Sequence, residues 1–352
     1  MNSIDILKQN PNVQIVYDGV KKKDEKTVRD ADGKPVPAII FGVEKKLSPK
    51  ELKKKKMEML PRSIDCKPTD VVQVGRIYAN PPIRSQTKEP QHGRWRPLKA
   101  GISVGHIDIT CGTLGAVVVG IKSATKRSLS SGSIISKIWN WLMRLFFSDD
   151  TPDPPTPEDP PEIDTGDRFI LSNLHVLNNE NKGKKGDTVI QPGDYDGGVS
   201  PDDAVATVHE AVLLKPNGVN YVDCCLAKIN KDIDSKLGQY GDLPIKSPLL
   251  NPKVGLKVNK VGRTTFYTEG KITVINAASR IWSDCGSILF ESQIVIESDN
   301  PYPFSDGGDS GSLIMDMDGR PVALLFAGSD VITLANPIGL VMEMLQTKFT
   351  FG

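Results

Sequence analysis

The feature that most constrains the fold is a series of short apolar runs that begins near residue 101 and continues almost to the C-terminus. Glycine, proline, asparagine and aspartate separate these runs, among them GTLGAVVVGI, RFILSN, DTVIQPG and YVDCCLAKI. Short apolar runs with turn residues between them are typical of antiparallel strands in a barrel or sandwich. The sequence therefore predicts an all-β domain over residues 101–352.

The first hundred residues have a different pattern. NVQIVY, PAIIFGVE and TDVVQVG predict strands, whereas SPKELKKKKMEML begins like a helix, with Ser48 as N-cap, Pro49 at the first helical position and Glu51 at the third. We therefore expect a small α+β domain over residues 1–76. The stretch 77–100 is rich in proline, glycine and charge, and predicts a linker.

One segment, 124–166, interrupts the β pattern. Its residues 134–147 include ten apolar side chains in fourteen, and as a helix they would extend about 21 Å, too short to cross a bilayer. An acidic, proline-rich stretch follows and predicts an extended chain. Three alternatives stay open for the apolar helix 134–147: docking on the barrel or a partner, contact with a membrane surface, and coverage of a substrate cleft.

Charge and cysteine content limit the partners and the cellular location that we expect for this chain. Residues 1–99 hold 22 lysines and arginines against 12 acidic residues, but no aromatic residues are interleaved and no nucleic-acid motif is present, so a solvated basic face is expected and nucleic acid is not. The five cysteines show no metal-ligand spacing. Free thiols and the lack of an apolar N-terminal run lead us to expect a cytoplasmic protein.

Three separate stretches carry residues suited to nucleophilic catalysis. His175 follows a strand in LSNLHV, Asp223 heads the run in VDCCLAKI, and Ser310 lies in GGDSGS. The order His, Asp, Ser is typical of the chymotrypsin arrangement. A serine hydroxyl needs an imidazole to take its proton, and a carboxylate to hold that imidazole. The alternatives are a glycine-rich turn around Ser310, and Asp202 or Asp203 in place of Asp223.

The glycines around Ser310 support a catalytic role. They allow a sharp turn, in which the amides of Gly308 and Ser310 can point into one pocket and hold an oxyanion. Asp309, next to the nucleophile, would either pair with a new N-terminus made by cleavage or be held by local hydrogen bonds. We expect the second, with no processing needed.

These motifs resemble those of chymotrypsin-fold (trypsin-like) serine peptidases, although Ser312 departs from the glycine of GDSGG. GTLGAVV, QPGDYDGG, KVGRTTFYTEG and LLFAGS extend the resemblance, over roughly residues 12–122 and 167–345, to a bacterial branch related to the plant narrow-leaf proteins. It implies a mainly β fold with two six-stranded chymotrypsin-like β-barrels after a small α+β N-terminal domain. It further implies a serine endopeptidase that acts on a protein or peptide and needs no cofactor or metal.

The resemblance also suggests a substrate pocket, with Phe304 at its base and Phe326, Ala327 and Gly328 as its wall. Because no acid lies at that base, we expect a small or apolar side chain to be preferred. Two other functions stay open: a catalytically latent scaffold, and a regulated defence or stress effector that acts through partner binding. The sequence leaves the oligomeric state open.

Overall fold

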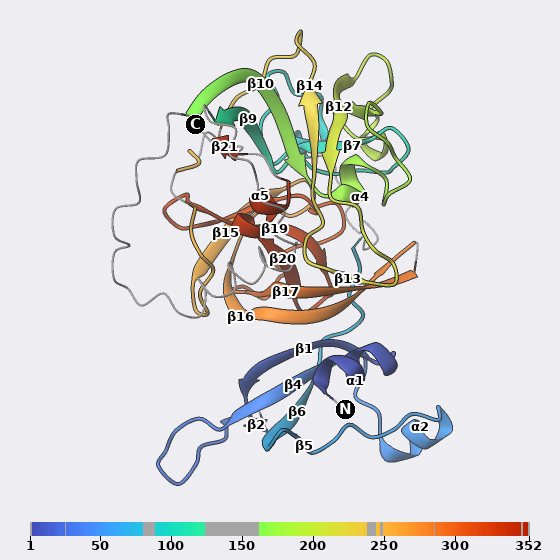
Figure 1. Cartoon of the computed structure of the whole chain (residues 1–352), viewed down its shortest axis with the longest axis vertical. Helices are drawn as coiled ribbons and strands as arrows, with labels where there is room; N and C mark the ends of the chain where they lie inside the picture. The colour runs from blue at the N-terminus through green and yellow to red at the C-terminus, as the bar shows by residue number, and fades with distance from the viewer. Residues whose placement is uncertain are drawn as a thin grey trace.

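The computed structural model describes residues 2–24, 26–79, 89–123, 162–237, 244–246, 249–284, 286–345 and 348–350. The predicted apolar helix 134–147 lies outside these residues. The architecture is mainly β, with an N-terminal region at one end and two further β-sheet regions stacked above it (Figure 1). In the described part of the chain, no helix is long and apolar enough to span a bilayer.

The N-terminal region contains the predicted strands and helix. Ser48 caps α2 through a capping box with Glu51, and Pro49 is the first helical residue, as the sequence predicted. A further short helix at the N-terminus, α1, was not predicted. The elements of this region are α1 (Ser3–Gln9), β1 (Val13–Val20), β2 (Lys22–Lys23), β3 (Lys26–Thr27), β4 (Pro37–Val43), α2 (Pro49–Lys54), β5 (Ser63–Ile64) and β6 (Lys67–Gln73).

An eight-stranded sheet forms the top of Figure 1, in the order β21-β9-β10-β14-β12-β11-β7-β8. Residues 162–166, which the sequence placed in the insertion, form the beginning of β10. The elements around this sheet are η1 (Pro90–His92), β7 (Ser103–His106), β8 (Gly112–Thr113), β9 (Ala116–Ser123), β10 (Glu162–Ser172), α4 (Leu174–Leu177), β11 (Thr188–Ile190), η2 (Asp194–Asp196), β12 (Ala204–Ala211), β14 (Cys225–Ile229) and β21 (Lys348–Thr350).

Six strands, β15 to β20, form a ring in the middle of the molecule, which we call the C-terminal ring. Neighbours pair in the order β17-β20-β19-β18-β15-β16, and β16 pairs again with β17, so the ring closes. Its elements are β15 (Lys257–Gly262), β16 (Phe266–Ser283), β17 (Gly286–Ser298), β18 (Leu313–Asp316), β19 (Pro321–Gly328) and β20 (Thr333–Pro337), with β13 (Val219–Asn220) on β17 and α5 (Ile338–Met344) after β20.

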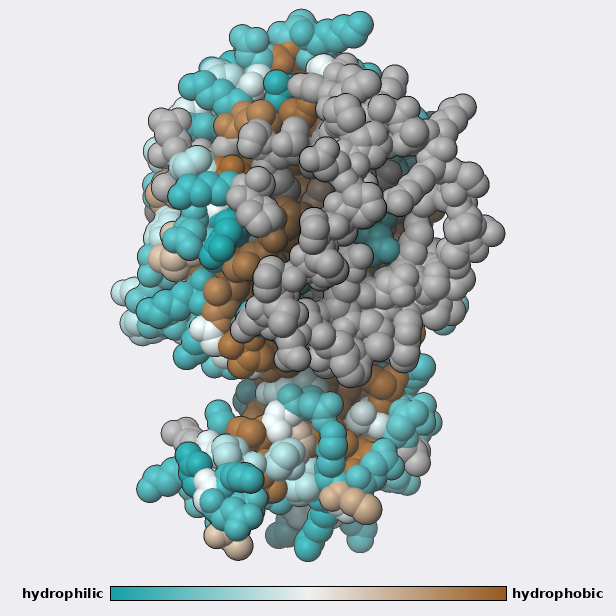
Figure 2. All heavy atoms as spheres, turned by 60° about the vertical axis from the view of Figure 1, so that its left-hand side comes forward, coloured by the Kyte–Doolittle hydropathy of each residue, from teal (hydrophilic) through white to brown (hydrophobic). Residues whose placement is uncertain are grey.

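The N-terminal region joins this ring through its sheet. Strand β1 pairs antiparallel with the long strand β16, with Ile15 opposite Ser279 and Val16 opposite Ala278. The described parts of the predicted linker 77–100 are packed as well, because Ile77, Leu98 and Ala100 are fully buried in the largest apolar cluster. Figure 2 shows a band of apolar residues on one face of the molecule.

Candidate active site

His175 and Asp223 meet where two strands of the eight-stranded sheet end. Strand β10 stops at Ser172, and the short helix α4 then presents His175. Nδ1 of His175 lies 2.7 Å from Oδ2 of Asp223, and both side chains are buried. The other oxygen of Asp223 accepts the amides of Leu174 at 2.7 Å and His175 at 3.3 Å. The carboxylate therefore holds both the imidazole and the backbone that carries it.

A chain of buried amides fixes Asp223 in turn. The Asp223 amide donates to Oδ1 of Asn336 at 2.9 Å, and Nδ2 of Asn336 donates to Oε1 of Gln293 at 2.6 Å. Nδ2 of Asn173 donates to the Asp223 carbonyl at 2.8 Å. Sequence reasoning missed these three residues. Asn173 stands at a strand-to-helix junction, which is a signal, but Asn336 lies 113 residues from Asp223 and carries none.

Ser310 sits in a turn that glycines make possible. Gly308 has φ of +92° and Gly311 has φ of +94°, a region that side chains strain to adopt. A Cβ on Gly311 would lie 2.0 Å from Oγ of Ser172, and one on Gly308 would lie 2.6 Å from Oγ1 of Thr264. Both positions therefore require glycine for space as well as for conformation.

The Ser310 turn and the helix of His175 lie on either side of β8. The amide of Thr113 donates to the Ser310 carbonyl at 2.8 Å. A Cβ on Gly112 would lie 2.4 Å from Val176, the residue after His175, and 3.1 Å from the same Ser310 carbonyl. The structure thus joins His175 directly to Asp223, and places Ser310 across β8 from the helix that carries His175.

The hydroxyl of Ser310 has a partner that the sequence did not predict. Its Oγ donates to the carbonyl of Ala79 at 3.0 Å. Nε2 of His175 is buried and has no hydrogen-bond partner among the described residues. The amides of Gly308 and Ser310 likewise donate to no acceptor in the described part of the chain.

Asp309 anchors the turn from inside the C-terminal ring. It is fully buried and accepts the amides of Thr264 at 2.8 Å, Thr265 at 3.1 Å and Asp306 at 2.9 Å. Nζ of Lys260, on β15, lies 3.4 Å from its Oδ2, and both side chains are wholly buried. Burial lowers the pKa of Lys260, against the nearby Asp309 carboxylate, which raises it. An internal ion pair thus joins the local hydrogen bonds at this turn.

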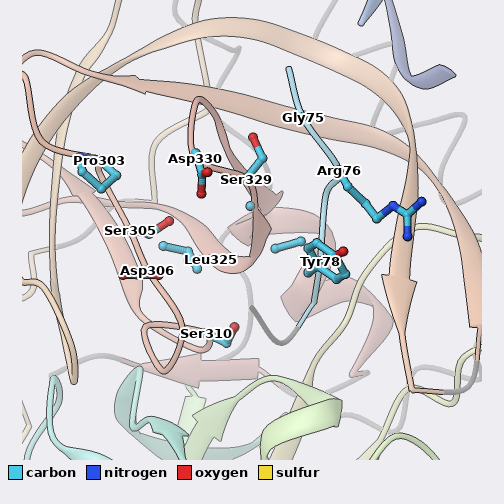
Figure 3. A pocket seen from close by; sticks show the side chains of 12 residues that line it. Gly75, Arg76, Tyr78, Pro303, Ser305, Asp306, Ser310, Leu325, Ser329 and Asp330 are labelled. Carbon is cyan, nitrogen blue, oxygen red and sulfur yellow. The ribbon is translucent and has the colours of Figure 1, made fainter. Parts of the chain in front are cut away.

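A cavity of about 180 Å³ opens beside Ser310 (Figure 3). Of the residues expected to form a substrate pocket, Ala327 and Gly328 line it, whereas Phe304 and Phe326 do not. Phe304 packs inside the C-terminal ring, and Phe326 packs at a tilt against Phe290. The neighbouring residues Pro303, Ser305 and Asp306 line the cavity in place of Phe304. The lining residues are Gly75, Arg76, Tyr78, Pro303, Ser305, Asp306, Ser310, Leu325, Ala327, Gly328, Ser329 and Asp330.

Two acidic residues, Asp306 and Asp330, are part of that lining. The expected preference for small or apolar side chains was based only on the lack of an acid at position 304, and did not include these two carboxylates. Figure 3 shows Ser305, Asp306 and Ser310 on one side of the cavity and Gly75, Arg76 and Tyr78 on the other. One wall is therefore supplied by the segment that leads out of the N-terminal region.

In this mainly β fold, the His175–Asp223 pair lies on one side of β8 and the turn of Ser310 on the other. Residues 217–328 match the model of Peptidase family S64. Over 101 residues the chain is 33% identical to Protein NARROW LEAF 1 of Oryza sativa subsp. japonica, a match that covers 26% of this chain and 17% of the rice protein. The predicted resemblance to trypsin-like serine peptidases and to the narrow-leaf proteins is therefore confirmed.

Solved structures give further matches. Protease A of Thermobifida fusca matches with a TM-score of 0.43 and 12% identity, over 72% of this chain and 98% of its own. A chymotrypsin of Cellulomonas bogoriensis matches with a TM-score of 0.38 and 15% identity, over 52% of this chain and 86% of its own.

Proposed function

We propose that this chain is a serine endopeptidase in which Ser310 is the nucleophile, His175 the general base and acid, and Asp223 the group that orients His175. The single observation that carries the proposal is the buried contact of 2.7 Å between Nδ1 of His175 and Oδ2 of Asp223, made beside the glycine turn of Ser310. A carboxylate only accepts hydrogen bonds, so the imidazole proton lies on Nδ1 and Nε2 is left as the base.

The proposed reaction follows from these positions. Nε2 of His175 takes the proton of Ser310 as Oγ forms a bond to the carbonyl carbon of the substrate. The resulting oxyanion accepts hydrogen bonds from the amides of Gly308 and Ser310, each worth roughly 3–4 kcal/mol in the transition state. The imidazolium then protonates the leaving amine, and an acyl-enzyme remains. A water then attacks the acyl carbon as Nε2 of His175 takes its proton. The imidazolium returns that proton to Oγ of Ser310 as the ester bond breaks, which releases the acid.

The topology supports a two-barrel description of residues 101–352, with the site at the seam. The C-terminal ring closes with six strands, and we assign the eight-stranded sheet to the other barrel. We keep residues 1–76 as a small N-terminal domain and 77–100 as its connection to the protease domain. A protein or peptide is the substrate class, and the cytoplasm remains the proposed location.

A second candidate function is a latent scaffold with the same residues. One observation favours it: Ser310 is buried, and its hydroxyl is engaged by the carbonyl of Ala79. A hydroxyl in that state has no free access to a substrate until the segment around Ala79 moves.

Labelling of the full chain with a fluorophosphonate separates the two functions. We expect adduct formation at Ser310, mapped by mass spectrometry, and its loss in Ser310→Ala and His175→Ala. Ser63→Ala is the matched control, because Ser63 is an exposed serine on β5, the last strand of its sheet. It should label as the parent does. Labelling that survives His175→Ala at an equal rate would refute the assigned base. Profiling of newly formed N-termini, with Ser310→Ala as reference, then tests for peptide-bond cleavage.

A further inference from the structure

Residues 77–79, which follow β6, lie between two strands of the C-terminal ring beside the candidate active site and form isolated β-bridges at Tyr78. Tyr78 pairs antiparallel with Gly328 of β19: the Tyr78 amide donates to the Gly328 carbonyl at 2.9 Å, and the Gly328 amide returns a bond of 3.0 Å to the Tyr78 carbonyl. On its other edge the strand pairs parallel with Trp282 of β16. The Trp282 amide donates to the Ile77 carbonyl at 2.9 Å, and the Ala79 amide donates to the Trp282 carbonyl at 3.0 Å.

Gly328 and Trp282 therefore form the two edges of a slot that is one strand wide. A strand in such a slot satisfies its amides and carbonyls on both sides, which is how sheets accept an added peptide. The slot ends at the nucleophile, because the carbonyl of Ala79 accepts the Ser310 hydroxyl at 3.0 Å. A serine hydroxyl has one proton, so while it donates to Ala79 it does not donate to His175.

Side chains set what this slot can hold. Ile77 is fully buried in the largest apolar cluster, and Ala79 is nearly so. Tyr78 points to the cavity that Ser305 and Ala327 also line (Figure 3). An occupant therefore needs an aliphatic side chain two residues before the one whose carbonyl meets Ser310, since a charged group there would lose its hydration without a partner.

Contacts outside the slot hold the segment in place. Oγ of Ser329 donates to the Val74 carbonyl at 2.5 Å. The guanidinium of Arg76 lies 4.5 Å from the centre of the Trp282 ring and 3.1 Å from Oε2 of Glu44. The Arg76–Glu44 pair is well exposed, so it adds little to the binding of the strand.

We propose that this slot is the peptide-binding site, that residues 77–79 occupy it in the resting chain, and that an extended substrate with an aliphatic residue at the Ile77 position enters by exchange with them. The effect of this exchange on catalysis rests on the proposed function, in which Ser310 is the nucleophile. The binding of a peptide in the slot does not depend on that assignment. A tethered strand acts at an effective concentration of roughly millimolar. A free peptide that makes the same bonds must therefore compete at about that concentration, which gives the resting enzyme a high KM.

Tyr78→Pro tests the exchange, with Tyr78→Ala as its matched control. Proline removes the amide that bonds to Gly328, whereas alanine keeps it, so the two variants differ mainly in the backbone bond. One such bond corresponds to roughly a two- to tenfold change in an equilibrium constant. We expect Tyr78→Pro to have a KM lower than that of Tyr78→Ala by this factor, and to react with the fluorophosphonate correspondingly faster.

A binding measurement removes the dependence on catalysis. Both Tyr78 variants are made in the Ser310→Ala background, and a fluorescein-labelled peptide of residues 74–79, VGRIYA, is titrated by anisotropy. We expect tighter binding to the proline variant, again by roughly two- to tenfold, and loss of binding when the isoleucine of the peptide is replaced by aspartate. With the peptide bound, the chain's own amides at residues 77 and 79 should exchange with solvent hydrogen faster than without it.

The outcomes separate the two proposals. Equal binding to the proline and alanine variants, or binding that leaves exchange at residues 77–79 unchanged, overturns the slot even if Ser310 reacts with the probe. Peptide binding with strand release, but no reaction of Ser310 in any variant, supports the slot and refutes the peptidase assignment.

Discussion

Removal of the Lys260 ammonium should destabilise the turn of Ser310 from its buried side. Nζ of Lys260 lies 3.4 Å from Oδ2 of Asp309, with both side chains wholly buried, and it also donates to the Phe266 carbonyl at 3.0 Å. At an effective dielectric constant of about 20, two unit charges at this separation attract by about 5 kcal/mol. Lys260→Met removes this attraction and leaves the Asp309 carboxylate without its cation.

The expected cost is set by the uncompensated carboxylate. Loss of one partner of a buried pair destabilises a protein by about 3–5 kcal/mol. Asp309 retains the amides of Thr264, Thr265 and Asp306, so the lower end, about 3 kcal/mol, is expected. Since a folded domain has about 5–15 kcal/mol of stability, the variant should still fold, but with a distorted oxyanion turn, a reduced kcat and a little-changed KM.

Urea unfolding at equal m-value measures this loss, and Lys228→Met is its matched control. Nζ of Lys228 lies 2.8 Å from Oδ1 of Asp167, but the two side chains are 38% and 42% exposed, so its loss should cost no more than about 1 kcal/mol. Lys260→Arg keeps the charge and should recover part of kcat. If Lys260→Met unfolds at the same urea concentration as Lys228→Met, with kcat intact, the buried pair does not support the turn and the reasoning fails.

Three further predictions rest on contacts of the same site. Asn336→Ala leaves the Asp223 amide unpaired and should cost about 1–3 kcal/mol of stability, with a lowered kcat, whereas unchanged urea unfolding and kcat would contradict its role. Gly311→Ala should destabilise more than Gly286→Ala in thermal unfolding, because both have positive φ but only Gly311 would place its Cβ against Ser172. The pKa of Lys260 is lowered by burial from 10.5. As pH rises between that lowered value and 10.5, the folded chain loses the Lys260 proton, so activity that needs its ammonium falls. Lys260→Met should abolish this fall in a pH series of kcat, and a fall that persists in the variant would exclude Lys260 as the titrating group.

Local signals predicted much of the fold. The capping box at Ser48 fixed the start of α2, and apolar runs bounded by turn residues located most of the strands in both sheets. The turn at Ser310 could be read because its glycines are adjacent in the chain and have a single physical reason to be there. In the long strand β16 (Phe266–Ser283), polar and small residues at 276–280 interrupt the apolar pattern, whereas pairing with β1 and β17 continues across them.

Contacts between distant stretches left no comparable signal. Lys260 lies in a run with Lys257 and looks like a second solvated lysine, yet the register of β15 against β16 and β18 turns its ammonium inward to Asp309. Asn336 and Gln293 are single amides in apolar strands, and their value to Asp223 depends on β17 and β20 pairing beside it. Such residues can be found only when the sheet order is known.

The slot beside Ser310 shows the same limit most clearly, because three distant stretches build it. Gly328 supplies one edge from β19, Trp282 supplies the other from β16, and the N-terminal region steadies that second edge: the indole of Trp282 donates to Oε1 of Gln14 at 2.9 Å. The strand between them comes from a stretch whose prolines and charges predicted a linker. Composition predicts how such a segment behaves when water surrounds it. It does not predict the conformation of the segment once two sheet edges form hydrogen bonds with its backbone on both sides. The N-terminal region is therefore linked to the candidate active site twice, through Gln14 on the wall of the slot and through Ile77–Ala79 within it.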